Sequence, residues 1–259
     1  MVNPASDPTT RFSIRVDDYR KFRPGYPPEC AELIRSTCRL TGDSVIADVG
    51  SGTGLMTQLL LPHCRRMYAV EPNDPMRGAA EEILGGEPGF VSVKGTAEET
   101  TLGDASVDLV VSAQAFHWFD RDRAKKEFKR ILRGERRVAL IWNNRLDRAD
   151  EFHRDMEKLF LDRLPEYHRV KHRDVPLPEI AEFYSPADVT RHIVPNQQEF
   201  DLSGFEGRIL SASYVPPRGD PRYEPFIKLV RELFRRHQRG GKVTMRYATA
   251  IYQGKFPLP

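Results

Sequence analysis

The chain has 259 residues, 39% of them hydrophobic and 30% charged, and its 40 Lys and Arg residues against 37 Asp and Glu give a formal net charge of +3. This composition can build a core and excludes a compositionally disordered chain, while the balanced charge does not by itself indicate a nucleic-acid binder. No apolar run approaches the roughly 18 residues that cross a membrane, and the first residues lack the apolar segment of a secretory signal.

The three cysteines indicate a reducing compartment. Cys30, Cys38 and Cys64 leave one thiol over from any pairing, and no CxxC motif occurs. Secreted disulfide scaffolds pair their cysteines, and structural zinc sites space them closely. We therefore expect free thiols and a cytoplasmic protein.

Composition divides the chain into three stretches. Residues 1–40 are polar and contain the sequence RPGYPP, residues 41–143 alternate short apolar runs with helical patterns, and residues 144–259 are richer in Arg, His and Pro. A chain of this length fits one large α/β domain. We expect a single domain whose core is the middle stretch.

The middle stretch alternates predicted strands and helices. Five short apolar runs bounded by turn residues predict buried strands at 45–49, 67–71, 90–93, 107–112 and 138–142. Of the helices between them, one ends at Pro62, one is capped by Asp74, and one is capped by Asp120 and closed by Gly134. Strands that are apolar on both faces and alternate with helices predict an α/β fold with a doubly wound parallel sheet.

The last third continues this pattern. A capping pair, Asp220-Pro221, begins an apolar helical stripe that continues to Phe234. Apolar residues at 243, 245 and 247, followed by Ile251 and Tyr252, predict a final strand at 242–256, and the stretch 190–200 is a further candidate strand.

A glycine-rich loop follows the first strand. Its sequence DVGSGTG places Gly50, Gly52 and Gly54 where the chain turns tightly and where a side chain would block a ligand. The next helix offers free N–H groups at its N-terminus. Glu71, 17 residues beyond Gly54, ends the second strand, and its carboxylate can accept hydrogen bonds from two ribose hydroxyls. These features predict a nucleoside site at the carboxyl ends of the strands.

The loop departs from the dinucleotide fingerprint G-x-G-x-x-G, because Leu55 stands where that pattern has its third glycine. The spacing D-x-G-x-G-x-G instead resembles the first motif of class I S-adenosylmethionine-dependent methyltransferases. YAVEPNDPM, GTAEE and SVDLVVSAQAFHWFD resemble later motifs of the small-molecule, type 11-like group, which includes relatives of trans-aconitate methyltransferase. RPGYP and TMRYATAIYQGK also fit that group, so the resemblance covers nearly the whole chain.

The resemblance implies a Rossmann-like methyltransferase fold, in which a seven-stranded, mostly parallel sheet has an antiparallel last strand and a helical cap. Residues 1–40 would form an N-terminal lid, 41–143 the cofactor-binding core, and 144–259 the cap insertions and the final strands. The implied cofactor is S-adenosyl-L-methionine, with S-adenosyl-L-homocysteine as its product. The implied activity is methyl transfer to a small molecule such as a carboxylic acid or another metabolite.

The resemblance also assigns cofactor contacts. Glu71 would bind the ribose, and Met76 would lie near the adenine. Thr96 stands where family members often carry an aspartate that accepts from the adenine amino group, and Glu98 is the neighbouring substitute. The full set of implied cofactor contacts is Tyr19, Arg23, Asp48, Gly50, Ser51, Gly52, Gly54, Glu71, Pro72, Met76, Thr96, Ala97, Glu98 and Gln114.

His117 is the candidate catalytic residue, because it is the histidine predicted at a strand's carboxyl end beside the cofactor. Packing beside Trp118 is the alternative role for His117. Arg23 is a candidate partner for the methionine carboxylate or for an acidic substrate, and a surface arginine is its alternative. The candidate substrate contacts are Tyr26, Trp118, Asn143 and Arg145.

No metal site, membrane partner or nucleic-acid partner is expected. His168 and His172 have helical i,i+4 spacing, but the Arg and Lys residues around them would repel a cation. The fourth strand is followed neither by an Asn/Asp-Pro-Pro-aromatic motif nor by a Pro-Cys pair, which resembling families use on nucleic-acid bases. Methylation of RNA or protein, a non-catalytic cofactor-binding protein and a nucleotide-dependent oxidoreductase stay open as alternatives.

Overall fold

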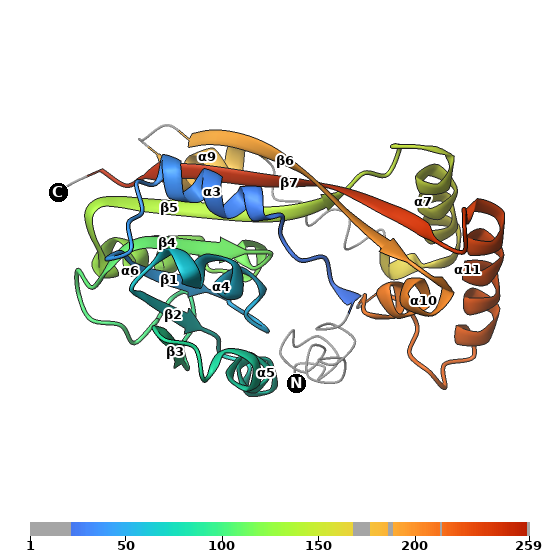
Figure 1. The fold of residues 1–259 in the computed structure, drawn as a ribbon, viewed down its shortest axis with the longest axis horizontal. Helices are drawn as coiled ribbons and strands as arrows, with labels where there is room; N and C mark the ends of the chain where they lie inside the picture. Colours follow the sequence, from blue (N-terminus) through green and yellow to red (C-terminus); the bar gives the residue numbers. More distant parts are fainter. Residues whose placement is uncertain (1–21, 168–176, 186–188, 213, 258–259) are drawn as a thin grey trace. The chain divides into compact units, whose positions relative to one another are not determined.

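The structure is a computed structural model that describes residues 22–167, 177–185, 189–212 and 214–257. The chain divides into two compact units. Unit 1 comprises Met1–Pro24, Asn144–Asp174 and Pro195–Ala248, and unit 2 comprises Gly25–Asn143, Val175–Val194 and Thr249–Pro259. In chain order the described elements are α3 (Pro28–Thr37), β1 (Val45–Val49), α4 (Leu55–Leu60), η2 (Leu61–His63), β2 (Arg66–Val70), α5 (Asp74–Leu84), β3 (Phe90–Val93), β4 (Val107–Ala113), η3 (Phe116–Trp118), α6 (Arg121–Ile131), β5 (Leu132–Arg145), α7 (Glu151–Arg163), α9 (Leu177–Tyr184), β6 (Val189–Phe200), α10 (Leu202–Leu210), α11 (Tyr223–His237) and β7 (Val243–Lys255) (Figure 1).

The seven strands form one sheet in the order β3-β2-β1-β4-β5-β7-β6. The pairs β2–β3, β1–β2, β1–β4 and β4–β5 are parallel. β5 and β7 are antiparallel, because Phe256 donates its N–H to the carbonyl of Arg136 while Leu146 donates to the carbonyl of Arg246. Residue numbers therefore fall along β7 as they rise along β5. The predicted mostly parallel, seven-stranded sheet with an antiparallel last strand is confirmed.

Alternate residues of the central strands enter two different cores of unit 2. Ala47 of β1 packs in a cluster with Phe128 of α6 and Phe183 of α9. Its neighbour Ile46 packs in a second cluster with Ile34 of α3 and side chains of α4, which lies in front of the sheet in Figure 1. Side chains of a strand point alternately to the two faces, so helices cover both faces of the sheet.

Three predicted helix boundaries were wrong. Asn73 rather than Asp74 caps α5, because Asn73 has extended backbone angles and its side chain accepts the N–H of Met76. Asp74 is the first helical residue, and its carboxylate pairs with Arg77 and Lys94. The α11 helix begins at Tyr223, and Asp220 accepts the N–H two residues later instead of capping it.

The third wrong boundary was the end of α6. The helix ends at Ile131, and Leu132 already pairs with Val107 as the first residue of β5. The register then shifts, and Gly134 and Arg136 have positive φ angles of 57° and 50°. Gly134 therefore lies in an irregular part of a strand and does not end a helix.

Unit 1 has a hydrophobic core of its own. Phe226, Val230 and Phe234 on one side of α11 are buried with residues of α7, α10 and β7. The predicted apolar stripe of this helix is confirmed. The Phe22 ring packs closely against Gly207 of α10: a Cβ atom added at Gly207 would lie only 2.3 Å from the ring.

The range predicted as an N-terminal lid contains a core helix. In α3, Cys30, Ala31 and Ile34 are buried, and they belong to one of the two core clusters of unit 2. Phe22 and Arg23 belong to unit 1, and residues 1–21 lie outside the described part of the chain. The cysteines at 30, 38 and 64 are free thiols.

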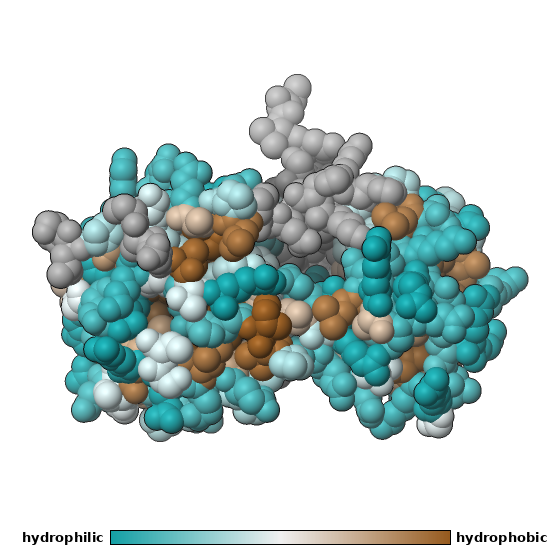
Figure 2. All heavy atoms as spheres, turned by 90° about the horizontal axis from the view of Figure 1, so that it is seen from above, coloured by the Kyte–Doolittle hydropathy of each residue, from teal (hydrophilic) through white to brown (hydrophobic). Residues whose placement is uncertain are grey.

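Large apolar side chains are scattered over the surface. The exposed ones among the described residues are Trp118, Leu146, Leu177 and Ile193. Figure 2 shows one face that is mostly hydrophilic, with hydrophobic residues in small separate patches. No helix within the described ranges is long and apolar enough to cross a membrane.

Replacing the cap residue Asp120 with alanine is expected to lower the free energy of unfolding by about 1 kcal/mol. The Asp120 side chain accepts the N–H of Arg123 at 3.2 Å, and alanine would leave that donor unpaired at the start of α6. Asp122→Ala is the control, because Asp122 lies in the first turn of the helix and is not the cap. Equal urea midpoints for the two variants would contradict the cap assignment.

Candidate functional site

The glycine loop turns at the end of β1. Gly50, Gly52 and Gly54 have positive φ angles of 73°, 57° and 83°, which side chains disfavour. A Cβ atom at Gly50 would lie 2.5 Å from the Cβ atom of Ala115, which follows β4. The loops after β1 and β4 therefore touch at the carboxyl edge of the sheet, and glycine is required at Gly50 for both reasons.

The Glu71 carboxylate joins the glycine loop to the loop after β2. One oxygen accepts the N–H of Gly52 at 2.9 Å, and the other accepts the N–H of Asn73 at 2.9 Å. The side chain is buried, and burial raises the pKa of Glu71 despite these two donors. Each carboxylate oxygen has a second lone pair, so Glu71 can still accept hydrogen bonds from a ligand.

Asp48 lies below the loop and is completely buried. One oxygen accepts the hydroxyl of Thr57 in α4 at 2.7 Å, and the other has no hydrogen-bond partner among the described residues. Burial raises the pKa of Asp48 to about 7, with the nearby Glu71 carboxylate as a smaller cause in the same direction. Asp48 is thus placed to position α4 and the glycine loop, with one oxygen unpaired.

Further buried polar atoms at this edge are also unpaired. Within the described residues, the hydroxyls of Ser51, Thr53 and Ser112 have no hydrogen-bond partner. Such atoms are uncommon in protein interiors unless a ligand or water satisfies them. The unpaired oxygens, the glycine turns and the Glu71 carboxylate fit a polar nucleoside ligand such as the adenosyl group of the implied cofactor.

Two of the implied contacts after β2 differ in exposure. Met76 is buried in α5, and its methyl group would lie 3.9 Å from a Cβ atom at Gly52. Pro72 is exposed. Met76 therefore lies directly beside the glycine loop, and its contact with the adenine stays a prediction.

The segment after β3 forms a tight turn. The Thr96 hydroxyl accepts the N–H groups of Glu98 and Glu99, and Ala97 is buried in the core. Glu98 accepts the N–H of Asp120 at 2.8 Å. The Thr96 hydroxyl, at the position where members of the resembling family often have aspartate, therefore accepts hydrogen bonds within the turn. Glu98 is held to the start of α6.

The segment after β4 carries Gln114 and the short helix η3. Gln114 has a φ angle of 61°, and its side-chain amide donates to the carbonyl of Asn143 at 3.4 Å. In η3 the rings of His117 and Trp118 lie 4.7 Å apart, and Trp118 is exposed. Phe116 is fully buried against Phe183 and Trp142, so its side chain is part of the core.

Asn143 connects three segments of unit 2. Its side-chain amide donates to the carbonyl of Gly25, and its side-chain oxygen accepts the hydroxyl of Thr249 in β7. Tyr26 is partly buried and packs against the core cluster that contains α3. These contacts give Asn143 a structural role beside its predicted substrate role.

Two predicted arginines belong to unit 1. Arg145 pairs with Asp147 and Glu157, donates to the Tyr167 hydroxyl at 2.7 Å and lies over the ring of Phe160. Arg23 donates to the carbonyl of Ser211 at 3.4 Å. The Arg145 guanidinium is thus held by carboxylates of its own unit.

Two other predictions fall outside the described residues. Tyr19 and the pair His168 and His172 lie in ranges for which the structure gives no placement. Within the part of the chain that is described, no group of three or more His, Cys, Asp or Glu side chains could hold a metal ion.

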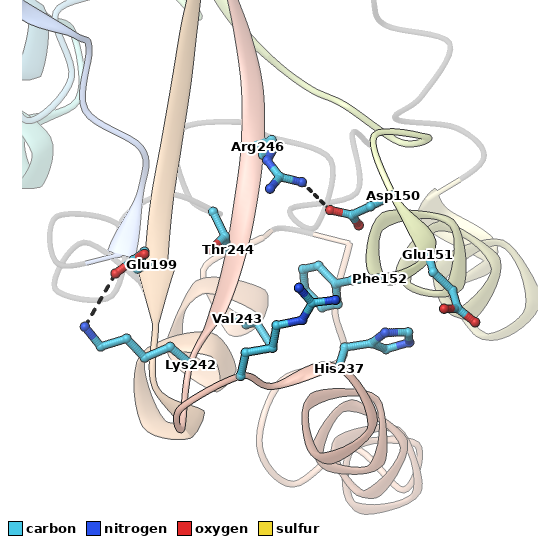
Figure 3. A pocket seen from close by; sticks show the side chains of 10 residues that line it. Asp150, Glu151, Phe152, Glu199, His237, Lys242, Val243, Thr244 and Arg246 are labelled. Carbon is cyan, nitrogen blue, oxygen red and sulfur yellow. Dashed lines mark hydrogen bonds and ion pairs between the residues drawn. The ribbon is translucent and has the colours of Figure 1, made fainter.

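Unit 1 has a hollow of about 440 Å³ between β7 and the start of α7 (Figure 3). Among its lining residues, Arg246 pairs with Asp150 and Lys242 with Glu199, and these pairs are drawn in Figure 3. Cations and carboxylates in this hollow therefore largely neutralise one another. It shares no residue with the glycine-loop site of unit 2.

Sequence reasoning missed three residues that position the glycine-loop site. Thr57 donates its hydroxyl to Asp48, and Asn73 caps α5 and donates its N–H to Glu71. The Ala115 side chain leaves no room for a Cβ atom at position 50. Asn73 has the same cap chemistry as the neighbouring Asp74, so its role could have been considered. Ala115 carries no sequence signal, because its contact joins two loops that are distant in the chain.

The contribution of Asp48 to the free energy of unfolding is expected to fall as the pH rises from about 4 to about 7. Its raised pKa means that the folded protein keeps this proton while the unfolded chain, with a pKa near 3.8, has lost it. The contribution is therefore fully present below pH 3.8 and is lost as pH rises through 7. Urea unfolding of wild type and Asp48→Asn across this range tests it. A stability difference between the two that does not change with pH would contradict the assignment.

Comparisons with known proteins agree on this region. Residues 47–140 match a family model described as a methyltransferase domain. An "Uncharacterized methyltransferase" of Mycobacterium tuberculosis is 38% identical over 143 residues, which are 55% of this chain and 56% of the relative. A "Probable S-adenosylmethionine-dependent methyltransferase" of Saccharomyces cerevisiae is 29% identical over 122 residues, 45% of this chain and 41% of the relative. The chain spans about half the length of the curated relatives it matches.

A solved structure supports the fold over most of the chain. The "Putative Type II Methyltransferase" of Anaeromyxobacter dehalogenans superposes with a TM-score of 0.64 and 23% identity, covering 92% of this chain and 100% of that one. At this identity the likeness shows the fold alone. The Rossmann-like methyltransferase fold expected from the sequence is confirmed.

Proposed function

We propose, from the match of residues 47–140 to a methyltransferase domain model, that the protein transfers a methyl group from S-adenosylmethionine to a small-molecule acceptor. The observation that carries the proposal is the buried Glu71 carboxylate at the end of β2, which bridges Gly52 and Asn73 beside unpaired hydroxyls. A carboxylate held in this way is preorganised to accept the two ribose hydroxyls of the cofactor.

Each group of residues has a separate task in this proposal. Gly50, Gly52 and Gly54 let the backbone approach the cofactor, and Ser51 offers it a hydroxyl. Met76 provides an apolar surface next to the loop. The bound cofactor supplies a methyl group that is already activated by a positive sulfur. The chain's own residues therefore have to bind and align the reactants and exclude water, and a carboxylate acceptor would need no base.

The choice of a small-molecule acceptor rests on the sequence. The segment after β4 reads AQAFHWFD, without the motifs that resembling families use on nucleic-acid bases, and the net charge is only +3. His117 and Trp118 in this segment are the proposed acceptor contacts. For an acceptor that must lose a proton, His117 is the proposed base.

Calorimetric titration with S-adenosylhomocysteine tests the cofactor, with NADH as the control. Micromolar binding of S-adenosylhomocysteine alone would support the proposal, whereas binding of NADH alone would replace it with an oxidoreductase. A screen of small-molecule, RNA and protein acceptors with a labelled methyl donor then tests the acceptor class. Labelling of RNA or protein alone would favour a macromolecular substrate, and binding without any transfer would favour a non-catalytic protein.

A further inference from the structure

Among the described residues of unit 1, one arginine is buried without a carboxylate partner. Arg208 in α10 is 8% exposed. Its guanidinium forms no ion pair with any carboxylate in the described part of the chain, although other arginines of the same unit do. Arg145 pairs with Glu157, Arg231 with Glu206 and Arg246 with Asp150. Arg208 is therefore a buried positive charge whose surroundings do not neutralise it.

The contacts of Arg208 are all with neutral groups, and besides its hydrogen bonds the guanidinium lies over the Tyr247 ring, 5.9 Å from the centroid. Its Nε donates to the Tyr247 hydroxyl at 3.1 Å, and Nη1 lies 3.5 Å from the Ser211 hydroxyl. The Tyr247 hydroxyl in turn donates to the Gln198 side-chain oxygen at 3.2 Å. These bonds hold the guanidinium in one orientation but leave Nη2 without an acceptor among the described residues. Nη2 is also not among the fully enclosed unpaired atoms, so it is not completely shielded from solvent.

A second guanidinium converges on the same residues. Arg23 donates to the carbonyl of Ser211 at 3.4 Å, and the carbonyl of Arg23 accepts the side-chain amide of Gln198 at 3.3 Å. The two arginines thus bond to opposite ends of one serine, Arg23 to its carbonyl and Arg208 to its hydroxyl.

Burial of a charge has a cost that only a counter-charge offsets well. An ion that leaves water without a counter-charge loses its hydration, and neutral hydrogen bonds recover only part of that loss. A guanidinium presents N–H groups in a fixed fork that matches the two oxygens of a carboxylate or the oxygens of a phosphate. The missing partner of Arg208 therefore has the chemistry of an oxyanion.

We propose that unit 1 binds a small oxyanion, a carboxylate or phosphate group of a small molecule, at Arg208. The oxyanion takes the free Nη2 donor of Arg208, and the Tyr247 hydroxyl holds the guanidinium from behind. Arg23 adds positive potential from the other side of Ser211. The assignment concerns unit 1 alone and does not depend on methyl transfer.

The test is calorimetric titration of the full chain with sodium succinate and, separately, with inorganic phosphate, at an ionic strength held constant with sodium chloride. Succinamide, which has the shape of succinate without its charge, is the third ligand. At least one of the two anions is expected to bind saturably, and Arg208→Gln is expected to weaken that binding roughly tenfold or more. Binding of succinate alone identifies a carboxylate site, and binding of phosphate alone a phosphate site.

Matched variants separate a local effect from misfolding. Arg231→Gln removes an arginine that is already paired with Glu206 on the surface of the same unit, and we expect it to leave binding unchanged. Tyr247→Phe keeps the ring and removes the hydroxyl that orients Arg208, so it should weaken binding in a protein that still unfolds cooperatively. It replaces Arg208→Gln if that variant does not fold. Three results would overturn the site: no binding of either anion, equal binding of succinamide, or equal losses in Arg231→Gln and Arg208→Gln.

Discussion

Glu71→Gln is expected to weaken the binding of S-adenosylhomocysteine by roughly thirtyfold, which corresponds to about 2 kcal/mol of charged hydrogen bonding. The wild-type carboxylate accepts one backbone N–H on each oxygen, from Gly52 and Asn73. A glutamine has a single oxygen, so its NH₂ group would face one of these two donors. The variant therefore loses an acceptor for the ribose hydroxyls and also loosens the glycine loop.

Isothermal titration of purified Glu71→Gln measures this effect. Glu87→Gln is the matched control, since Glu87 is exposed in the turn before β3 and the same change there should leave binding unaltered. Melting temperatures of both variants show whether the loss is confined to the site. A folded Glu71→Gln protein with wild-type affinity would remove Glu71 as the ribose contact.

Gly50→Ala is expected to lower the free energy of unfolding by roughly 2–5 kcal/mol and to abolish cofactor binding. The φ angle of 73° would strain any L side chain, and the new Cβ atom would lie 2.5 Å from the Cβ atom of Ala115. Relief of this clash has to move the loop after β1 away from the loop after β4. The residues that the proposal gives to the cofactor lie on these loops.

Urea unfolding compares Gly50→Ala with Gly42→Ala, where the added Cβ atom meets nothing within 4 Å and φ is not positive. The double variant Gly50→Ala with Ala115→Gly should recover the part of the loss that is due to the clash and retain the part that is due to φ. If Gly50→Ala were as stable as Gly42→Ala, the contact between the two loops would not exist in solution.

Much of the sheet could be predicted because its signals are local. The apolar run at 45–49 and the glycines after it mark a buried strand and a tight turn, and both lie where expected. The side-chain alternation of a strand and the φ preference of glycine act over a few residues, so a short window of sequence contains them. The place of Glu71 was predictable for the same reason, because it directly follows the second strand.

Helix boundaries were harder to predict because neighbouring residues compete for the same role. Asn73 and Asp74 are both residue types that cap helices well, and Asn73 is the cap because its backbone angles are extended while Asp74 is already helical. Gly134 is a glycine, the residue type that often ends a helix. The helix ends earlier, because Leu132 pairs with Val107 and begins a strand. The competing interaction in this case came from a strand 25 residues away in the chain.

The short-range pattern of the sequence was sufficient to predict the α/β class, the glycine loop and the carboxylate after β2. Each of these features depends on residues that are neighbours in the chain. Packing in three dimensions was needed to show that Arg145 is held by Glu157, that Phe116 is a core residue and that Arg208 is buried without a carboxylate. The cost of a buried charge or ring depends on which distant side chains surround it, and no spacing rule contains that information. For this reason an arginine predicted as a binding residue proved to be paired, while the one that lacks a counter-charge had no sequence signal.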